Sequence, residues 1–335
     1  MFLKRNEIGS EFWNIEKTDK QNGLFDLQTS WFISGRSALT SIIQNIKKTS
    51  GFKRVAMPSW CCDSMLVPFI NNGIDINFYS VIVKEGKLIQ DLSGVNHSDV
   101  LFLMDYFGYQ STADYDFDGK IIRDLTHSIF IKRYNDADYY FGSLRKWSGF
   151  ITGGFAQGIC AKRQKQNNEY CQLREQAMLQ KSQYVAGVRE DKNFLQSFLL
   201  AEEMLESEEV FGALHKDIES ANTLNVGFIK QRRRENARLL IDELSDFVLF
   251  KNLNEDDCPL FVPICLPEEK RNALRKFLIE NKIYCPIHWP ISKHHILTSE
   301  QTKIYQQELS LICDQRYGLE EMWKIIESIK KFFKR

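Results

Sequence analysis

Short apolar runs alternate with segments of helical spacing through the first half of the chain. The run at 100–107, VLFLMDYF, is nearly continuous, as in a strand that is covered on both faces. After Trp31–Ile33, apolar residues recur at helical spacing from Leu39 to Ile46, which predicts a helix beginning between Ser34 and Arg36. A second helix is predicted at 63–71. Further strands are predicted at 55–58, 75–81, 119–123, 139–141 and 153–160.

This alternation predicts an α/β fold with a parallel or mixed sheet between helices. Residues 164–246 are rich in charge and have helical periodicity. The remainder reads as strand, helix, strand, helix, with strands at 247–250 and 259–266, a strand and turn near 282–291, and helices at 268–282 and 319–333. We expect a large domain at 25–235 and a smaller α+β domain made of 1–24 and 236–335.

Composition and charge exclude several classes of protein. The 335 residues are 43% hydrophobic and 26% charged with a formal net charge of zero, which is typical of a soluble globular protein. No overall field favours nucleic acid or a membrane surface, and we expect Arg232–Arg234, followed by Glu235, to form the solvated face of a helix. No apolar run approaches the ~20 residues of a membrane helix, and the first residues do not resemble a signal peptide.

The cysteines and histidines do not predict a metal site. None of the eight cysteines form a CxxC pair, which favours reduced thiols and a cytoplasmic location over a disulfide or zinc scaffold. His288, His294 and His295 are close in sequence, but no cysteine or carboxylate stands at ligand spacing beside them. We expect no metal.

The first candidate site is the start of the helix near Ser34. A Ser-Gly-Arg-Ser turn that opens a helix presents backbone N–H groups and a positive dipole end, which suits a phosphate. The same residues are also an ordinary N-cap. Both interpretations remain open from the sequence.

The second candidate is Asp124, which follows the strand predicted at 119–123, with His127 three residues further on. Ligands of α/β sheets bind beyond the carboxyl ends of the strands. A carboxylate there would keep a cofactor's pyridine nitrogen protonated. Alternatively, Asp124 caps a following helix and His127 is an interior histidine with satisfied hydrogen bonds.

The third candidate is Lys146, in a polar turn between a strand and the Gly153–Gly154 pair. Serine acyl enzymes also use S-x-x-K, but the S-D-N and K-T-G tripeptides that accompany it are absent. A lysine that attacks an aldehyde must lose its proton, so its pKa must fall from about 10.4, and Arg145 beside it could favour that. There is no G-x-G-x-x-G, P-loop or H-E-x-x-H motif, and Trp60 could stack on a flat ring or fill a core.

In combination these segments resemble the DegT/DnrJ/StrS family of sugar aminotransferases, which have the fold-type I architecture of pyridoxal-phosphate (PLP) enzymes. The resemblance covers nearly the whole chain. SGRSAL is similar to the family's S-G-T-A-A-L loop, IIRDLTHS to I-I-E-D-A-A-H/Q-A, and the SLRKW segment to the family's lysine segment that ends in G-G. VAMPSWCCDSM, MDYFGYQSTADYD, RRRENARLL, IYCPIHWPI and ELSLICDQRY are similar to five further family segments in the same order.

The resemblance implies a homodimeric PLP-dependent aminotransferase that moves an amino group from glutamate or glutamine to a keto-sugar, itself linked to a nucleotide. Lys146 would form the aldimine and act as base, Asp124 would face the pyridine nitrogen, and His288 would bind substrate. Other residues implied at the cofactor are Gly35, Arg36, Ser37, Trp60, Cys62, His127 and Ser143.

The segment around Lys146 departs from the family pattern, because Ser143 stands three residues before Lys146 rather than five. Arg36 replaces a small residue and Cys62 replaces an aromatic one. Alternative functions are a PLP- or sugar-binding module without transaminase activity, or a PLP lyase or decarboxylase.

Overall fold

The computed structural model describes residues 7–131, 135–162 and 164–334, and these fall into two compact units. The first unit comprises the residues up to Gly51 together with Tyr139–Val226, and the second comprises Phe52–Asp138 and Gly227–Arg335. The predicted boundaries at 25, 235 and 236 remain predictions.

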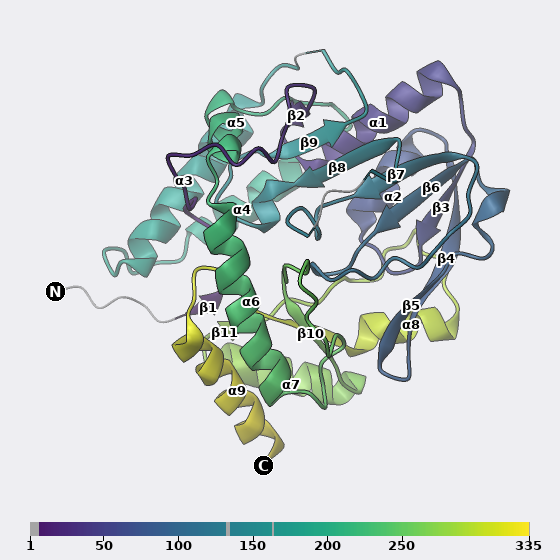
Figure 1. The fold of residues 1–335 in the computed structure, drawn as a ribbon. Coiled ribbons are helices and arrows are strands. Elements are labelled where there is room, and N and C mark those ends of the chain that lie inside the picture. The colour runs from purple at the N-terminus through teal and green to yellow at the C-terminus, as the bar shows by residue number, and fades with distance from the viewer. Residues whose placement is uncertain (1–6, 132–134, 163, 335) are drawn as a thin grey trace. The chain divides into compact units, whose positions relative to one another are not determined.

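Among its described residues, the first unit contains three antiparallel strands of the larger sheet and four α-helices. Strand β9 (Gly154–Gln157) lies between β2 (Ser30–Phe32) and β8 (Tyr139–Ser143), and Gly154 is opposite both Phe32 and Ser143. Helix α1 (Gly35–Thr49) packs on these strands through its buried Ile42, Ile43 and Ile46. The other elements of this unit are β1 (Ile8–Gly9), the single 3-10 turn η2 (Leu144–Lys146), and the helices α3 (Asn168–Val185), α4 (Phe194–Met204) and α5 (His215–Asn222) (Figure 1).

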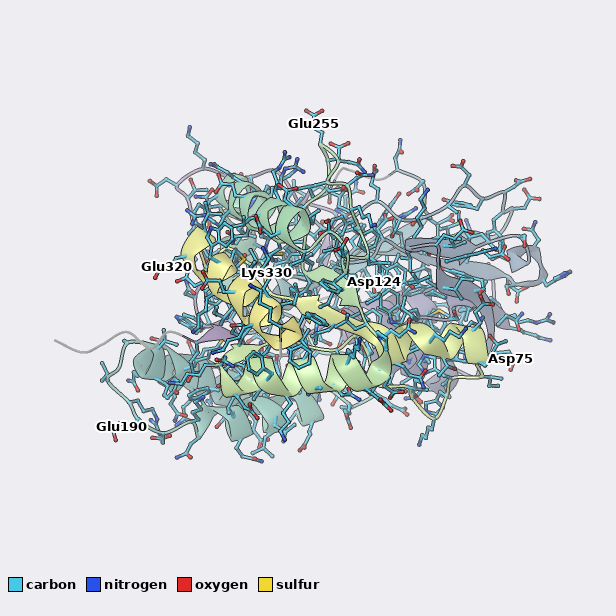
Figure 2. The ribbon with its side chains drawn as sticks, turned by 90° about the horizontal axis from the view of Figure 1, so that it is seen from below. Asp75, Asp124, Glu190, Glu255, Glu320 and Lys330 are labelled. Atoms are coloured by element: carbon cyan, nitrogen blue, oxygen red, sulfur yellow. The ribbon has the colours of Figure 1, made fainter. Side chains whose placement is uncertain are left out.

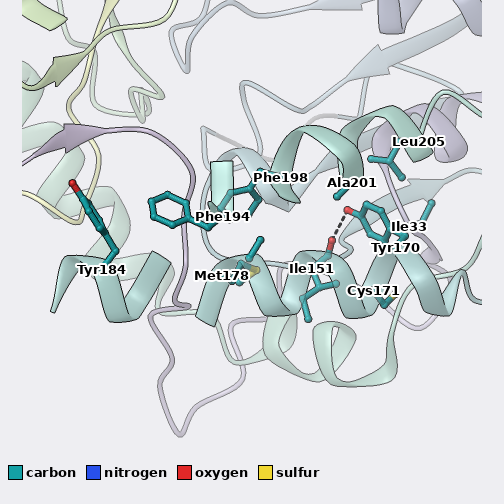
Figure 3. Packing of buried hydrophobic residues seen from close by; sticks show 11 residues of the cluster. Ile33, Ile151, Tyr170, Cys171, Met178, Tyr184, Phe194, Phe198, Ala201 and Leu205 are labelled. Atoms are coloured by element: carbon teal, nitrogen blue, oxygen red, sulfur yellow. Dashed lines mark hydrogen bonds between the residues drawn. The ribbon is translucent and has the colours of Figure 1, made fainter. Parts of the chain in front are cut away.

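The core of the first unit lies where α3 packs on α4 (Figure 3). Phe194 and Phe198 of α4 are buried in the same cluster as Met178 of α3. At one end of the cluster the Tyr170 hydroxyl donates to the carbonyl oxygen of Ile151 at 2.7 Å. This bond anchors the loop between η2 and β9 to helix α3.

The second unit is built on a mixed sheet in the order β7-β6-β3-β4-β5. The first four strands are parallel, and β5 is antiparallel to β4. The bounds are β3 Arg54–Pro58, β4 Asp75–Lys84, β5 Lys87–Asp91, β6 Val100–Met104 and β7 Lys120–Asp124, with α2 at Asp63–Asn71 and a 3-10 turn at Val95–His97. All five residues of β6 are buried, as its continuous apolar run predicts.

The C-terminal part of the second unit pairs β10 (Val262–Cys265) with β12 (Glu308–Leu311) in antiparallel register. Helices α7 (Glu268–Glu280) and α9 (Leu319–Phe333) lie side by side (Figures 1 and 2). Helix α9 has acidic residues in its first turn and basic residues in its last, which complement the helix dipole, and Figure 2 labels Glu320 and Lys330 among them. The remaining elements are α6 (Val226–Glu243), β11 (Ile283–Tyr284) and α8 (Ser299–Gln307).

The local pattern predicted many element bounds correctly. Helices α2 and α9 begin and end where expected, and α1 begins at Gly35, inside the predicted interval. The strand expected at 100–107 ends at Met104, because Asp105 turns away to accept the N–H groups of Ser111 and Thr112.

Two expectations are wrong and one helix was missed. Residues 247–250 form no strand, only one isolated bridge between Val248 and Ile264, and the Phe247 ring stacks on Phe333 of α9 instead. Helix α8 was not predicted, although a capping box at its start was the available signal.

Arg233, expected on a solvated face, is fully buried. It donates to the Gln315 side chain and to two backbone carbonyl oxygens. A buried guanidinium needs such acceptors, which come from segments distant in sequence.

Candidate active site

The start of helix α1 has the geometry of both an N-cap and an anion site. Ser34 is in the extended conformation and its Oγ accepts the backbone N–H of Ser37 at 3.2 Å. The first turn of the helix contains no acidic residue. Its N–H groups and dipole therefore favour an anion without local charge repulsion. The N-cap interpretation is confirmed, and it is compatible with phosphate binding.

Close backbone packing joins this helix start to β8 and β9. A Cβ added to Gly154 would lie 2.0 Å from the Ser34 carbonyl oxygen, so only glycine fits there. A Cβ on Gly35 would lie 3.4 Å from the Ser143 Cβ. Gly35, Ser37 and Ser143 thus come from three positions in the sequence to one corner of the first unit, and Ser143 is buried there.

Arg36, the other residue predicted at this corner, is directed toward the end of helix α4. One of its terminal nitrogens donates to the carbonyl oxygen of Leu205 at 2.9 Å. The contact fixes where the guanidinium lies. Its role at a phosphate remains a prediction.

Lys146 is the last residue of the turn η2, directly after β8. The turn is fixed at both ends, because Leu144 donates to the Gly153 carbonyl oxygen at 2.9 Å and Trp147 donates to that of Leu144 at 2.9 Å. Leu144 and Trp147 are fully buried, whereas Lys146 is exposed. A rigid base thus supports a long basic side chain.

A cationic network adjoins this turn within the first unit. Arg145 forms an ion pair with Glu202, and Arg174 contacts the same carboxylate at 3.1 Å. Burial and the neighbouring Arg174 lower the pKa of Arg145 to about 10, which still leaves it charged at neutral pH. Arg145, Arg174 and Lys146 all interact electrostatically with Glu11. The turn therefore lies in a region of net positive charge.

In the second unit, Asp124 is the final residue of β7 and is buried. Its Oδ1 accepts the Thr126 N–H at 2.7 Å. Residues 125–131 contain no helix, so within the described part of the chain Asp124 closes a turn and does not cap a helix. His127, also buried, accepts the Phe107 N–H through Nδ1 at 3.3 Å.

An aromatic cluster surrounds His127 and His288, and we define it as Trp60, Tyr106, Phe107, His127, His288 and Trp289. The ring centroids of His127 and His288 are 5.9 Å apart, and Trp289 stacks on His127 at 5.5 Å. Trp60 stacks on Tyr106 at 4.7 Å and donates its indole N–H to the His288 carbonyl oxygen at 2.7 Å. Three predicted site residues, Trp60, His127 and His288, therefore lie in one cluster.

Cys62 is the N-cap residue of α2, and its Sγ lies 2.8 Å from the Ser64 Oγ. Its predicted place at the cofactor remains a prediction.

The structure also reveals Glu308 and Ser310 on β12 beside His288, which the sequence reasoning missed. The alternation in Glu-Leu-Ser-Leu signalled a strand with two polar residues on one face.

Hydrogen bonds hold His295, one of the three histidines near 288–295. His295 is engaged with the Tyr305 hydroxyl at 3.0 Å and with the Ser292 N–H at 3.0 Å. Within the described residues no group of three or more His, Cys, Asp or Glu side chains could hold a metal ion. All eight cysteines are free thiols.

Comparison with known proteins identifies the fold. No family model and no curated protein sequence matches the chain. Among solved structures, the PLP form of the putative sugar aminotransferase Spr1654 from Streptococcus pneumoniae superposes with a TM-score of 0.64 and 15% identity, over 95% of this chain and 92% of that one. Helicobacter pylori PseC, an aminotransferase involved in the biosynthesis of pseudoaminic acid, superposes with a TM-score of 0.62 and 16% identity, over 97% of this chain and 100% of that one.

A DegT DnrJ EryC1 StrS aminotransferase from Brucella abortus gives a TM-score of 0.60 and 16% identity, over 91% of this chain and 85% of that one. The chain therefore has the α/β fold of fold-type I PLP enzymes. The three solved structures named here share this fold with the chain. Over the part of the chain that is described, no helix has the length and apolarity to cross a membrane.

Proposed function

We propose that this chain is a PLP-dependent aminotransferase that transfers an amino group from glutamate or glutamine to a keto-sugar carried on a nucleotide. The observation that carries the proposal is the match along 95% of the chain to Spr1654, the putative sugar aminotransferase solved in PLP and PMP forms. A lysine on a rigid turn and a Ser-Gly helix start, both in the first unit, support it.

The residues present fit the cofactor. A phosphate suits the corner made by Gly35, Ser37 and Ser143, where a helix N-terminus meets two hydroxyls and no acidic residue stands in the first turn. A pyridine ring suits the buried carboxylate of Asp124, since a protonated ring nitrogen would be a charged hydrogen-bond partner in addition to the Thr126 N–H. When bound, PLP supplies an electron sink for the bonds at the substrate's amino-bearing carbon.

Each protein group then has a defined task. Lys146 would hold the cofactor through Nζ and would move the proton at the reacting carbon. Asp124 would keep the pyridine nitrogen protonated, and Gly35, Arg36, Ser37 and Ser143 would bind the phosphate. His127, Trp60 and Cys62 would line the ring, and His288 would contact the sugar.

The first test concerns the cofactor and Lys146. Purified protein incubated with PLP should gain a visible absorbance band, and borohydride followed by peptide mapping should locate the label on Lys146. Lys146→Ala should abolish both signals. Lys162→Ala, which removes an exposed lysine of the same unit, should leave both unchanged. Protein that stays colourless with excess PLP, or a label on another lysine, would refute the assignment.

The second test concerns the reaction. L-Glutamate or L-glutamine should convert the PLP form of the protein to the PMP form, with release of the keto acid. A protein that binds PLP but reacts with neither donor is a binding module, and carbon dioxide or an eliminated product would indicate a decarboxylase or lyase. Homodimerisation, also a prediction of the resemblance, is tested by light scattering of the PLP-loaded protein.

A further inference from the structure

Glu308 and Ser310 form a hydrogen-bonded chain to His288 within the second unit. Glu308 is fully buried, and its Oε2 accepts the His288 backbone N–H at 2.7 Å. Its Oε1 lies 2.5 Å from the Ser310 Oγ, which in turn lies 2.9 Å from Nδ1 of the His288 ring. Residues two apart on a strand share a face, so β12 presents both groups to His288.

The chain has two arrangements because the Ser310 hydroxyl carries a single hydrogen. When Glu308 is ionised, Ser310 donates to the carboxylate, and the Ser310 oxygen accepts a hydrogen from Nδ1. When Glu308 is protonated, its carboxyl group donates to Ser310, and Ser310 donates to Nδ1. In a neutral imidazole, the first arrangement puts the ring hydrogen on Nδ1 and the second puts it on Nε2.

We propose that Glu308 is a positioning residue that acts through Ser310 to decide which ring nitrogen of His288 carries the hydrogen. The His288 ring plane is held independently of this choice. Its backbone is fixed on both sides by Glu308 and Trp60, and its ring packs against Phe107 and Phe261 at 5.2 and 5.0 Å. The tautomer can therefore change without the ring moving.

The surroundings of Glu308 favour its protonated form near neutral pH. Burial raises its pKa to about 8, although the hydrogen bonds from Ser310 and the His288 N–H and the charge of Arg271 oppose the rise. Arg271 of α7 donates to the Glu308 backbone carbonyl oxygen at 3.0 Å. The other titratable groups that face this chain are Cys265, opposite Glu308 on β10, Cys285, and His127 beside the His288 ring.

This arrangement gives His288 a specific use, which rests on the proposed function. Near neutral pH its Nε2–H would donate to an oxygen atom of the sugar. If that hydrogen is transferred, Ser310 passes its own hydrogen to Nδ1 and Glu308 passes the carboxyl hydrogen to Ser310. One proton leaves the chain, and the resulting negative charge remains on Glu308, near Arg271.

Nitrogen NMR of the histidine rings tests the inference without any assay of activity. Protein loaded with ¹⁵N-histidine is titrated from pH 5 to 9, and the His288 signal is assigned by its loss in His288→Gln. While Glu308 is protonated, we expect neutral His288 to carry its hydrogen on Nε2. As the pH rises and Glu308 ionises, we expect the hydrogen to move to Nδ1. Ser310→Ala and Glu308→Gln should both remove this change.

Two further variants separate the chain from general effects on structure. Ser310→Thr retains the hydroxyl, so this variant should show the tautomer change that Ser310→Ala lacks. Glu300→Gln, which neutralises an exposed carboxylate on α8 in the same unit, should not alter it. A wild-type His288 that keeps one tautomer throughout, or the same change in Ser310→Ala, would overturn the inference. Absence of transamination with an intact NMR change would refute only the proposed function.

Discussion

Replacing Gly154 by alanine tests whether close backbone packing holds the helix start in place. The added Cβ would meet the Ser34 carbonyl oxygen at 2.0 Å, the Ser34 carbonyl carbon at 2.2 Å and the Gly35 nitrogen at 2.9 Å. All three are backbone atoms, so no side-chain rotation relieves the contacts. Helix α1 must shift away from β9, or β9 must distort.

The magnitude follows from comparison with a matched glycine. Gly94 has a φ of −102° and nothing within 4 Å of an added Cβ. Replacing glycine by alanine lowers the conformational entropy of the unfolded chain, which stabilises the folded state by about 0.4–1 kcal/mol at either position. This contribution cancels when the two variants are compared. Forcing an extra carbon into a packed region costs about 1–3 kcal/mol. We therefore expect Gly154→Ala to be about 1–3 kcal/mol less stable than Gly94→Ala.

Urea unfolding followed by fluorescence and circular dichroism measures this difference, and PLP titration of the folded variants measures its consequence. Gly154→Ala should bind PLP more weakly, because Ser34 and Gly35 move, while Gly94→Ala should bind it like the wild type. Equal unfolding midpoints for the two variants would refute the packing argument. A destabilised Gly154→Ala with normal PLP affinity would instead refute the assignment of the phosphate to this corner.

Three other outcomes are expected. Since burial raises the pKa of Glu308 from 4.5 to about 8, the folded chain holds a proton that the unfolded chain releases across that window, so stability falls as pH rises. In the wild type, the free energy of unfolding measured by chemical denaturation at pH 5, 6 and 7 should fall by about 1.4 kcal/mol per pH unit. Glu308→Gln should remove this fall. Arg233→Lys should lower the free energy of unfolding in urea by about 2 kcal/mol, because an ammonium group cannot reach acceptors on both sides. The same change at the partly exposed Arg232 should lower it by less than about 0.5 kcal/mol. A thiol reagent should react with the native protein fastest at Cys160, the exposed cysteine. If a Cys160→Ser variant still shows this fast reaction, the prediction is contradicted.

The sequence by itself determined the features that depend on local spacing. The bounds of α2 and α9, the buried run of β6 and the start of α1 follow from apolar periodicity and capping within about 15 residues. The position of Lys146 on a turn after a strand was likewise readable, because glycines and polar residues punctuate the apolar runs. The class of fold followed from the order of these segments.

Tertiary structure alone decided which groups meet. Trp60 and His288 are 228 residues apart in sequence, yet they share a hydrogen bond, and no local pattern encodes that contact. Arg233 has the sequence context of a solvated charge and becomes a buried one only because Gln315 and a distant loop supply its acceptors. In the same way, Glu308 is an ordinary carboxylate in the sequence. Burial beside His288 and Ser310 is what alters its pKa and links it to the candidate site.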